Sequence, residues 1–266
     1  MRDFSAAKAL FRDVIDARNY FDSVSAEIAR HKVENSIETK EAPLIFLIGD
    51  PGVGKSYILK LINLEQSKNS LTVFIDHPFF DKRDLLKILY EAKGIAFDKD
   101  TNFNELKEVL LENYRDSNHT IFIDEAQLLN EEQFELIRIL SDTKVFQFVL
   151  SMHKEEGMAI LEKKHFKSRT KVVVEYGVLH HDEVFRYIKS SLQSVGQEDI
   201  MEMFTEKIAK KITHYCNGNF RTIKKFLFTL LSLLEYAKQN GLRKYDKINP
   251  CLLQMSALEI GVIHDK

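Results

Sequence analysis

The feature that most constrains the fold of this chain is the segment Gly-Asp-Pro-Gly-Val-Gly-Lys-Ser at residues 49–56. It matches the pattern G-x-x-x-x-G-K-S/T at every fixed position. An apolar run, Leu44 to Ile48, precedes it, and a helical pattern from Lys55 to Leu64 follows it. Glycines let the backbone curl so that its N–H groups point inward, and the next helix directs its positive end to the same place. The motif therefore predicts a phosphate cradle between a buried strand and a helix.

The cradle assigns a role to two of its residues. In this pattern the lysine reaches the β- and γ-phosphates of a nucleotide, and the hydroxyl of the last residue binds Mg²⁺. We therefore expect Lys55 to contact phosphate and Ser56 to be a metal ligand. A chance glycine-rich turn is the alternative, which the flanking strand and helix disfavour. The predicted nucleotide-binding residues are Gly49, Asp50, Pro51, Gly52, Val53, Gly54, Lys55, Ser56 and Tyr57.

A second motif follows the apolar run Thr120 to Ile123, where the carboxylates Asp124 and Glu125 come directly after a predicted strand. Ligands of open α/β sheets bind at such strand ends. Asp124 is expected to hold Mg²⁺, and Glu125 is expected to be the catalytic residue that polarises the attacking water. Acids that merely cap the next helix are the alternative. No guanine-reading N/TKxD motif follows, so ATP and Mg²⁺ are the predicted cofactors.

Apolar runs and helical patterns alternate over the first two thirds of the chain, which predicts a mainly parallel α/β sheet. The remaining runs are Leu71 to Ile75, Val145 to Leu150 and Lys171 to Val174, and the helical patterns between them are Asp81 to Ala92, Phe103 to Tyr114 and Glu131 to Leu140. Beyond residue 178 only helical patterns occur. The predicted organisation is a helical lead-in (1–42), a P-loop domain (43–178), a helical lid (179–250) and a C-terminal tail (251–266).

Composition indicates where the protein is located and which partners it can bind. The net charge of -2 gives no global basic field, so any contact with DNA would need a local patch. The most apolar segment, residues 226–234, is far shorter than the roughly 20 residues that span a bilayer as a helix. No export signal precedes it, and the two cysteines have no metal-binding or disulfide spacing. We therefore expect a cytoplasmic protein with no transmembrane segment.

Beyond these motifs the chain resembles the ExeA-like, general secretion pathway branch of AAA+ ATPases, which is related to ATPases that assist transposition. The likeness covers about residues 20 to 240. It includes Asp-Glu-Ala-Gln at 124–127 and Gly-Asn-Phe-Arg at 218–221, where Phe220 replaces the usual proline. The resemblance implies a five-stranded parallel P-loop core of the AAA+ type, with helices on both faces and a C-terminal helical lid.

Three further site roles follow from that resemblance alone. Arg169 matches the arginine finger, which in this class usually serves the nucleotide of a neighbouring subunit; a surface arginine is the alternative. Arg221 matches the sensor-2 arginine of the lid, unless it simply begins a helix and pairs with an acid. His153 stands where the family places a polar sensor-1 side chain, with Ser151 as its rival and a histidine without a role as the other alternative.

Two polar groups stay ambiguous. Asp76 and His77 follow the second predicted strand, where they could contact the catalytic glutamate, although a helix cap before Asp81 is favoured. The basic residues of the predicted lid could bind a phosphodiester backbone, although an amphipathic helix with lysines outside is favoured. Those residues are Lys207, Lys210, Lys211, Lys224 and Lys225, with Arg243, Lys244 and Lys247 as a second cluster.

The predicted function is ATP hydrolysis that drives conformational change in a larger assembly. The resemblance implies a homo-oligomer, with the arginine finger acting in trans, and a protein partner in an envelope-linked secretion, pilus or DNA-uptake machine. Peripheral association with the inner face of the membrane would go through that partner. One alternative is a DNA-binding ATPase that assists transposition or replication. The other is a nucleotide switch without hydrolysis, which the presence of Glu125 disfavours.

Overall fold

The computed structural model describes residues 3–12, 20–76, 79, 81–115, 119–167 and 170–263. The chain divides into two compact units. One comprises Ala26–Pro51 and Lys55–Tyr176, and the other comprises Met1–Ser25, Gly52–Gly54 and Gly177–Lys266.

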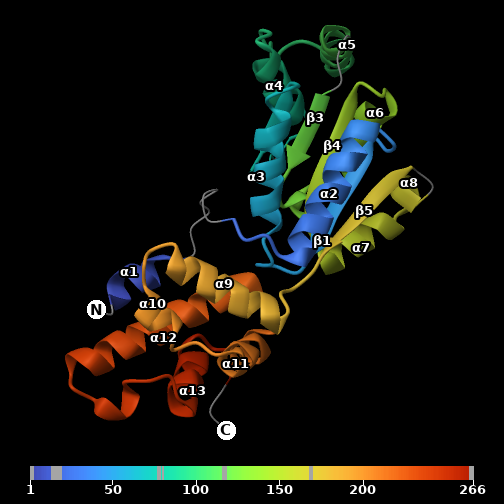
Figure 1. Ribbon diagram of the computed structural model, residues 1–266. Coiled ribbons are helices and arrows are strands. Elements are labelled where there is room, and N and C mark those ends of the chain that lie inside the picture. Colours follow the sequence, from blue (N-terminus) through green and yellow to red (C-terminus); the bar gives the residue numbers. More distant parts are fainter. Residues whose placement is uncertain are drawn as a thin grey trace. The chain divides into compact units, whose positions relative to one another are not determined.

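The first unit is built on a sheet of five parallel strands in the order β2-β3-β4-β1-β5 (Figure 1). The strands are β1 (Leu44–Gly49), β2 (Thr72–Ile75), β3 (His119–Ile123), β4 (Phe146–His153) and β5 (Lys171–Tyr176). All residues of β1 and β3 are buried. This explains why their sequences are continuous apolar runs rather than alternating patterns, since both faces of a parallel sheet are covered. The predicted fold class is confirmed.

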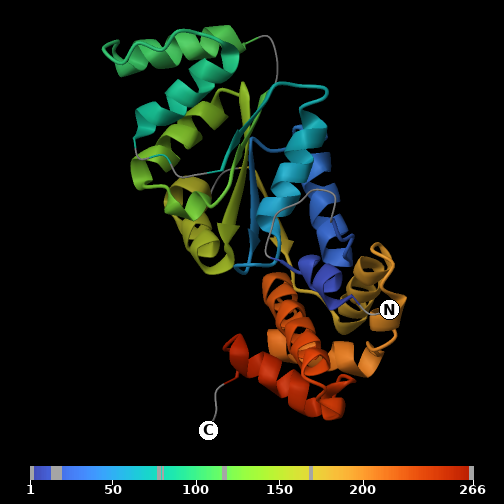
Figure 2. The same ribbon diagram turned by 90° about the vertical axis from the view of Figure 1, so that its left-hand side faces the viewer.

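Helices cover both faces of the sheet (Figure 2). On one face lie α2 (Val24–Thr39) and α3 (Lys55–Gln66). On the other face lie α4 (Lys82–Lys93), α6 (Glu131–Asp142) and α7 (Lys154–Glu162). The unit also contains α5 (Phe103–Tyr114), which packs on α4, and the short α8 (Lys164–Lys167). Alternate side chains of β1, such as Phe46, join the core beneath α4 and α6. Packing of helices on both faces thus holds the strands, and with them the positions of their ends, in place.

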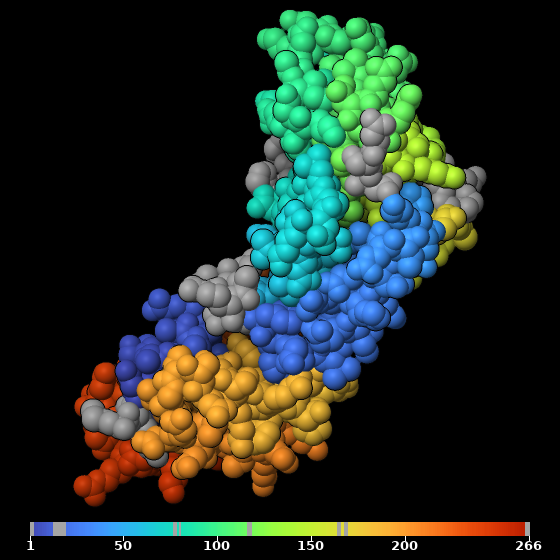
Figure 3. Space-filling model, turned by 45° about the horizontal axis from the view of Figure 1, so that its top comes forward, coloured from blue at the N-terminus to red at the C-terminus, as the bar shows by residue number. Residues whose placement is uncertain are grey.

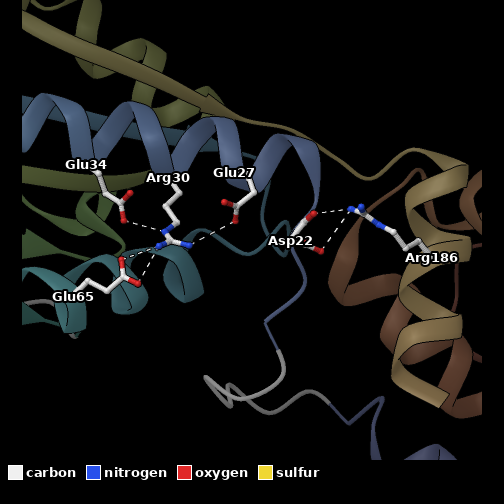
Figure 4. A network of polar contacts seen from close by, with 6 residues as sticks. All are labelled: Asp22, Glu27, Arg30, Glu34, Glu65 and Arg186. Carbon is white, nitrogen blue, oxygen red and sulfur yellow. Dashed lines mark hydrogen bonds and ion pairs between the residues drawn. The ribbon is translucent and has the colours of Figure 1, made fainter. Parts of the chain in front are cut away.

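An ion-pair network fastens α2 to α3, which lie side by side on the surface (Figure 3). The guanidinium Nη2 of Arg30 donates to both carboxylate oxygens of Glu65 at 3.0 Å, and its Nε donates to Glu34 at 2.9 Å (Figure 4). Burial lowers the pKa of Arg30, but the neighbouring carboxylates outweigh that effect and raise it above its ordinary value. The helix that follows the glycine-rich loop is therefore anchored at its far end.

The second unit is helical. Its elements are α1 (Phe4–Ala9), α9 (His181–Gln193), α10 (Glu198–Met201), α11 (Glu206–Cys216), α12 (Phe220–Gln239) and α13 (Pro250–Glu259). A common core joins Phe4 of α1 to Leu230 of α12 and Leu252 of α13. In the same unit Arg186 Nη2 donates to the backbone carbonyl of Asp22 at 2.6 Å (Figure 4). The N-terminal residues thus belong with the C-terminal helices.

The structure corrects several predicted element boundaries. Strand β4 continues to His153, three residues beyond the predicted end, because it pairs with β1 along its length. Helix α7 was not predicted, since Gly157 interrupts its apolar pattern. The segment predicted as a tail contains α13, in which Leu252 and Leu253 are buried. In the predicted helical lead-in, α1 spans Phe4–Ala9, and residues 1, 2 and 13–19 lie outside the described residues.

Candidate active site

The glycine-rich loop leaves the end of β1 and enters α3 at Lys55. Gly52 and Gly54 have φ angles of 82° and 117°, which are conformations that only glycine adopts readily. The Lys55 side chain is 5% exposed, and its Nζ donates to the carbonyl oxygens of Gly49 at 2.8 Å and Asp50 at 3.0 Å. A buried ammonium and the positive end of a helix therefore belong to the same loop, an arrangement suited to an anion.

Strand register brings the two sequence motifs to one edge of the sheet. Gly49 of β1 pairs with His153 of β4, and Ile123 at the end of β3 pairs with Leu150 of β4. The backbone N–H of Asp124 then donates to the carbonyl of Ile75, the last residue of β2, at 2.9 Å. Four strands thus deliver their carboxyl ends to the same place, where open α/β sheets bind ligands.

Asp124 is 6% exposed, and its two carboxylate oxygens are in different situations. Oδ1 accepts hydrogen bonds from the hydroxyl of Ser151 and, at 3.1 Å, from the backbone N–H of Glu125. Oδ2 receives no donor from the part of the chain that the structure describes. An oriented carboxylate oxygen of this kind, together with the half-buried hydroxyl of Ser56, is the oxygen donor set that Mg²⁺ prefers. These residues fit the expected metal.

Glu125 adopts a left-handed backbone conformation, with φ 51° and ψ 39°, which is uncommon for a residue other than glycine. Its N–H lies within hydrogen-bonding distance of Asp124 Oδ1 and of Ser151 Oγ at 3.3 Å, which supports this conformation. Its carboxylate is partly exposed, and Oε2 lies 3.2 Å from Nε2 of His153. The structure thus brings two predicted site residues, Glu125 and His153, into direct contact.

The structure separates the two candidates for the sensor-1 position. Ser151 is fully buried and bonds to Asp124, whereas His153 is partly exposed and pairs with Glu125. Sequence reasoning named both residues but did not connect either to its carboxylate partner. It also missed the side chain of Gln127, which donates to Glu125 Oε2. The only sequence signal for Gln127 was its place in the Asp-Glu-Ala-Gln motif.

The remaining predicted residues lie elsewhere or outside the described chain. Arg169 and His77 are not among the described residues. Asp76 lies with Oδ2 4.0 Å from Nζ of Lys60 on α3. The cap of α4 is Asp81 itself, which accepts from the N–H of Arg83 at 2.7 Å. Arg221 is exposed in the first turn of α12, in the helical unit, and its sensor-2 role stays a prediction.

Comparison with known families shows which proteins the region around this site resembles. The family model described as AAA domain matches residues 37–156, which include both motifs. The matched region is similar to AAA domains and makes up less than half of the chain. It is 24% identical over 234 residues to General secretion pathway protein A of Aeromonas hydrophila, an alignment that covers 84% of this chain. The predicted resemblance to ExeA-like AAA+ P-loop ATPases is confirmed. The alignment covers 41% of the relative, so the chain spans about two fifths of that protein's length.

Solved structures agree on the fold. A Walker-type ATPase of Pyrococcus abyssi superposes with a TM-score of 0.63 at 16% identity, over 94% of this chain and 75% of that one. Cdc6p from Pyrobaculum aerophilum gives a TM-score of 0.64 at 16% identity, over 88% of this chain and 66% of that one. At such low identity these likenesses establish the fold alone. Among the described residues, no helix is both long and apolar enough to cross a membrane.

Proposed function

We propose that this protein binds ATP and hydrolyses it to ADP and phosphate. The observation that carries the proposal is the glycine-rich loop, whose buried Lys55 ammonium lies against the carbonyls of Gly49 and Asp50. Lys55 would neutralise charge on the β- and γ-phosphates, and the loop N–H groups would hold them. Ser56 and Asp124 would hold Mg²⁺, which when bound screens the phosphate charge.

In the proposed reaction, water attacks the γ-phosphate in line with the leaving ADP oxygen, and Glu125 accepts a hydrogen bond from that water. The carboxylate is suited to this task because it is partly exposed, accepts a hydrogen bond from Gln127 and lies beside His153 at the same strand edge as the loop. Ser151 holds Asp124 and, through it, the backbone of Glu125. Each step uses a group that the sheet register brings to one edge.

The test is steady-state hydrolysis of ATP with Mg²⁺ by the wild type and by Glu125→Gln, together with nucleotide affinity. Glutamine keeps the size of the side chain but is a far weaker base, so we expect the rate to fall by at least about 100-fold while ATP binding is preserved. Glu132→Gln, on the exposed face of α6, is the control and should leave the rate unchanged. A wild type that binds ATP without hydrolysing it would favour a nucleotide switch or a missing activating partner.

We further propose that the protein works as a homo-oligomer in which Arg169 serves a neighbouring nucleotide. The name of the Aeromonas relative supports a partner in secretion, and a contact with the membrane would go through that partner. A guanidinium supplied in trans would stabilise charge on the γ-phosphate only in the assembly. Specific activity should therefore rise with protein concentration and lose that dependence in Arg169→Ala. A wild-type rate that is independent of concentration would refute the trans role.

A basic face on α11 supports a second candidate, a DNA-binding ATPase. Lys207, Lys210, Lys211 and His214 are all exposed on this helix at spacings that place them on one side. Phosphate contacts release counterions, so binding through this face would weaken as salt rises. Adding DNA to the hydrolysis assay at low and at raised salt tests the candidate. If DNA stimulates ATP hydrolysis at low salt and raised salt abolishes that stimulation, the DNA-binding hypothesis is favoured over the secretion hypothesis.

A further inference from the structure

Gln127 lies two residues beyond Glu125, in the single turn of 3₁₀ helix Ala126–Leu128. Its side-chain amide bridges two elements of the site. Nε2 donates to Oε2 of Glu125, and Oε1 accepts a long hydrogen bond of 3.4 Å from the backbone N–H of His153, at the end of β4. The amide therefore ties the carboxylate of Glu125 to the strand that carries His153.

The chemistry of both partners fixes the orientation of this amide. An ionised carboxylate only accepts hydrogen bonds, so the NH₂ group of Gln127 must face Glu125. A backbone N–H only donates, so the carbonyl oxygen must face His153. A flipped amide would set two acceptors against each other at one end and two donors at the other. The bridge thus has one self-consistent arrangement.

Two side-chain nitrogens approach the same oxygen of Glu125. Gln127 Nε2 and His153 Nε2 both approach Oε2, the latter at 3.2 Å. Within the described part of the chain, Oε1 receives no donor. A carboxylate held through one oxygen has lost most of its rotational freedom while its other oxygen stays open to solvent. Oε1 is therefore the atom that can accept a hydrogen bond from water.

We propose that Gln127 is a positioning residue for hydrolysis: it holds Oε2 of Glu125 and so presents Oε1 to the attacking water. This inference rests on the proposed role of Glu125 as the water-polarising residue. The amide suits the task because its NH₂ group has no titratable proton and remains a donor at every pH. Without Gln127 the carboxylate would lose its side-chain hydrogen-bond donor and would sample orientations in which neither oxygen faces the water.

The experiment measures kcat, KM for ATP and nucleotide affinity for Gln127→Ala and Gln127→Glu beside the wild type. A hydrogen bond to a charged group supports an expected fall in kcat of about ten- to a hundredfold for Gln127→Ala. KM and nucleotide affinity should stay within about twofold, because Gln127 acts through Glu125. Gln127→Glu keeps the shape of the side chain and the acceptor for the His153 N–H but removes the donor to Glu125. Its kcat should therefore fall at least as far as that of Gln127→Ala.

Gln133→Ala is the matched control. Gln133 also makes two hydrogen bonds through its amide, donating to the carbonyl of Phe79 and accepting from the N–H of Asn130 at 2.7 Å, but it contacts neither Glu125 nor His153. This variant should lose stability while the folded protein keeps its kcat. A similar fall in kcat for Gln133→Ala would show that losing any such bridging amide slows the enzyme, and would overturn the inference.

The outcomes separate this inference from the function on which it rests. If Glu125→Gln is inactive but Gln127→Ala retains the wild-type kcat, the positioning role is wrong and the proposed reaction stands. If Glu125→Gln hydrolyses ATP like the wild type, the role of Glu125 fails, and that of Gln127 fails with it. A loss in kcat alone for both Gln127 variants, with Glu125→Gln inactive, supports the proposal.

Discussion

Replacing Lys55 with alanine is expected to weaken nucleotide binding by at least about 100-fold, which corresponds to about 2.7 kcal/mol. The loss is large because the ammonium is buried beside the loop and would make charge-assisted hydrogen bonds, each worth about 1.5–3 kcal/mol. A methyl group cannot replace these bonds. Titration of a fluorescent ATP analogue, or calorimetry with ATP and Mg²⁺, measures the effect.

Lys60→Ala is the control for the lysine substitution, because Lys60 lies on the same helix but its side chain is 43% exposed, with its Nζ 4.0 Å from Asp76. It should change nucleotide affinity by less than about twofold, since exposed ion pairs contribute little. Lys55→Ala also removes the donor to two loop carbonyls, so a thermal melt without nucleotide must show that it folds. Tight ATP binding by a folded Lys55→Ala protein would contradict the phosphate role of this lysine.

The core of the fold could be predicted because its signals are local. Strands β1 and β3 are buried on both faces, so their sequences are apolar runs that need no partner to be recognised. The loop at residues 49–56 needs glycines at positive φ and a lysine at the helix start, and both requirements are visible in the sequence. For elements with a strong local pattern, the predicted bounds therefore lie close to the observed ones.

The contacts that organise the candidate site could not be predicted, because they depend on strand register. Ser151 meets Asp124 and His153 meets Glu125 only because β4 runs beside β3 and continues beyond Leu150. No local pattern marks that continuation, since the end of a strand is set by its neighbour. The bridge through Gln127 depends on the same register and was missed for the same reason.

The helical unit was recognised from its amphipathic periods, but its extent was not. Helix α13 has apolar residues around most of its circumference, so it lacks the one-sided pattern that marked α9 and α11. Its burial depends on contact with α12. A helix that is covered on several sides carries little periodic signal, and only the packed structure reveals it.

Gly218→Ala is expected to destabilise the helical unit by about 2–5 kcal/mol. Gly218 has φ 68° and lies in the turn between α11 and α12, and its carbonyl accepts from the N–H of Leu179 at 2.9 Å. An added Cβ would lie 2.4 Å from the carbonyl oxygen of Leu179, which is backbone and cannot rotate away. Positive φ costs about 1–2 kcal/mol, and overpacking adds about 1–3 kcal/mol. Denaturant unfolding followed by circular dichroism measures the change.

Gly196→Ala separates the two parts of that cost. Gly196 follows α9 with φ 66°, nearly the same angle, but nothing lies within 4 Å of its added Cβ. It should therefore lose only the conformational part, about 1–2 kcal/mol. If both substitutions cost the same, the close approach of Gly218 to Leu179 contributes nothing to stability. A larger loss at Gly218 would instead give the glycine of the Gly-Asn-Phe-Arg segment a packing requirement of its own, independent of any nucleotide contact made by Arg221.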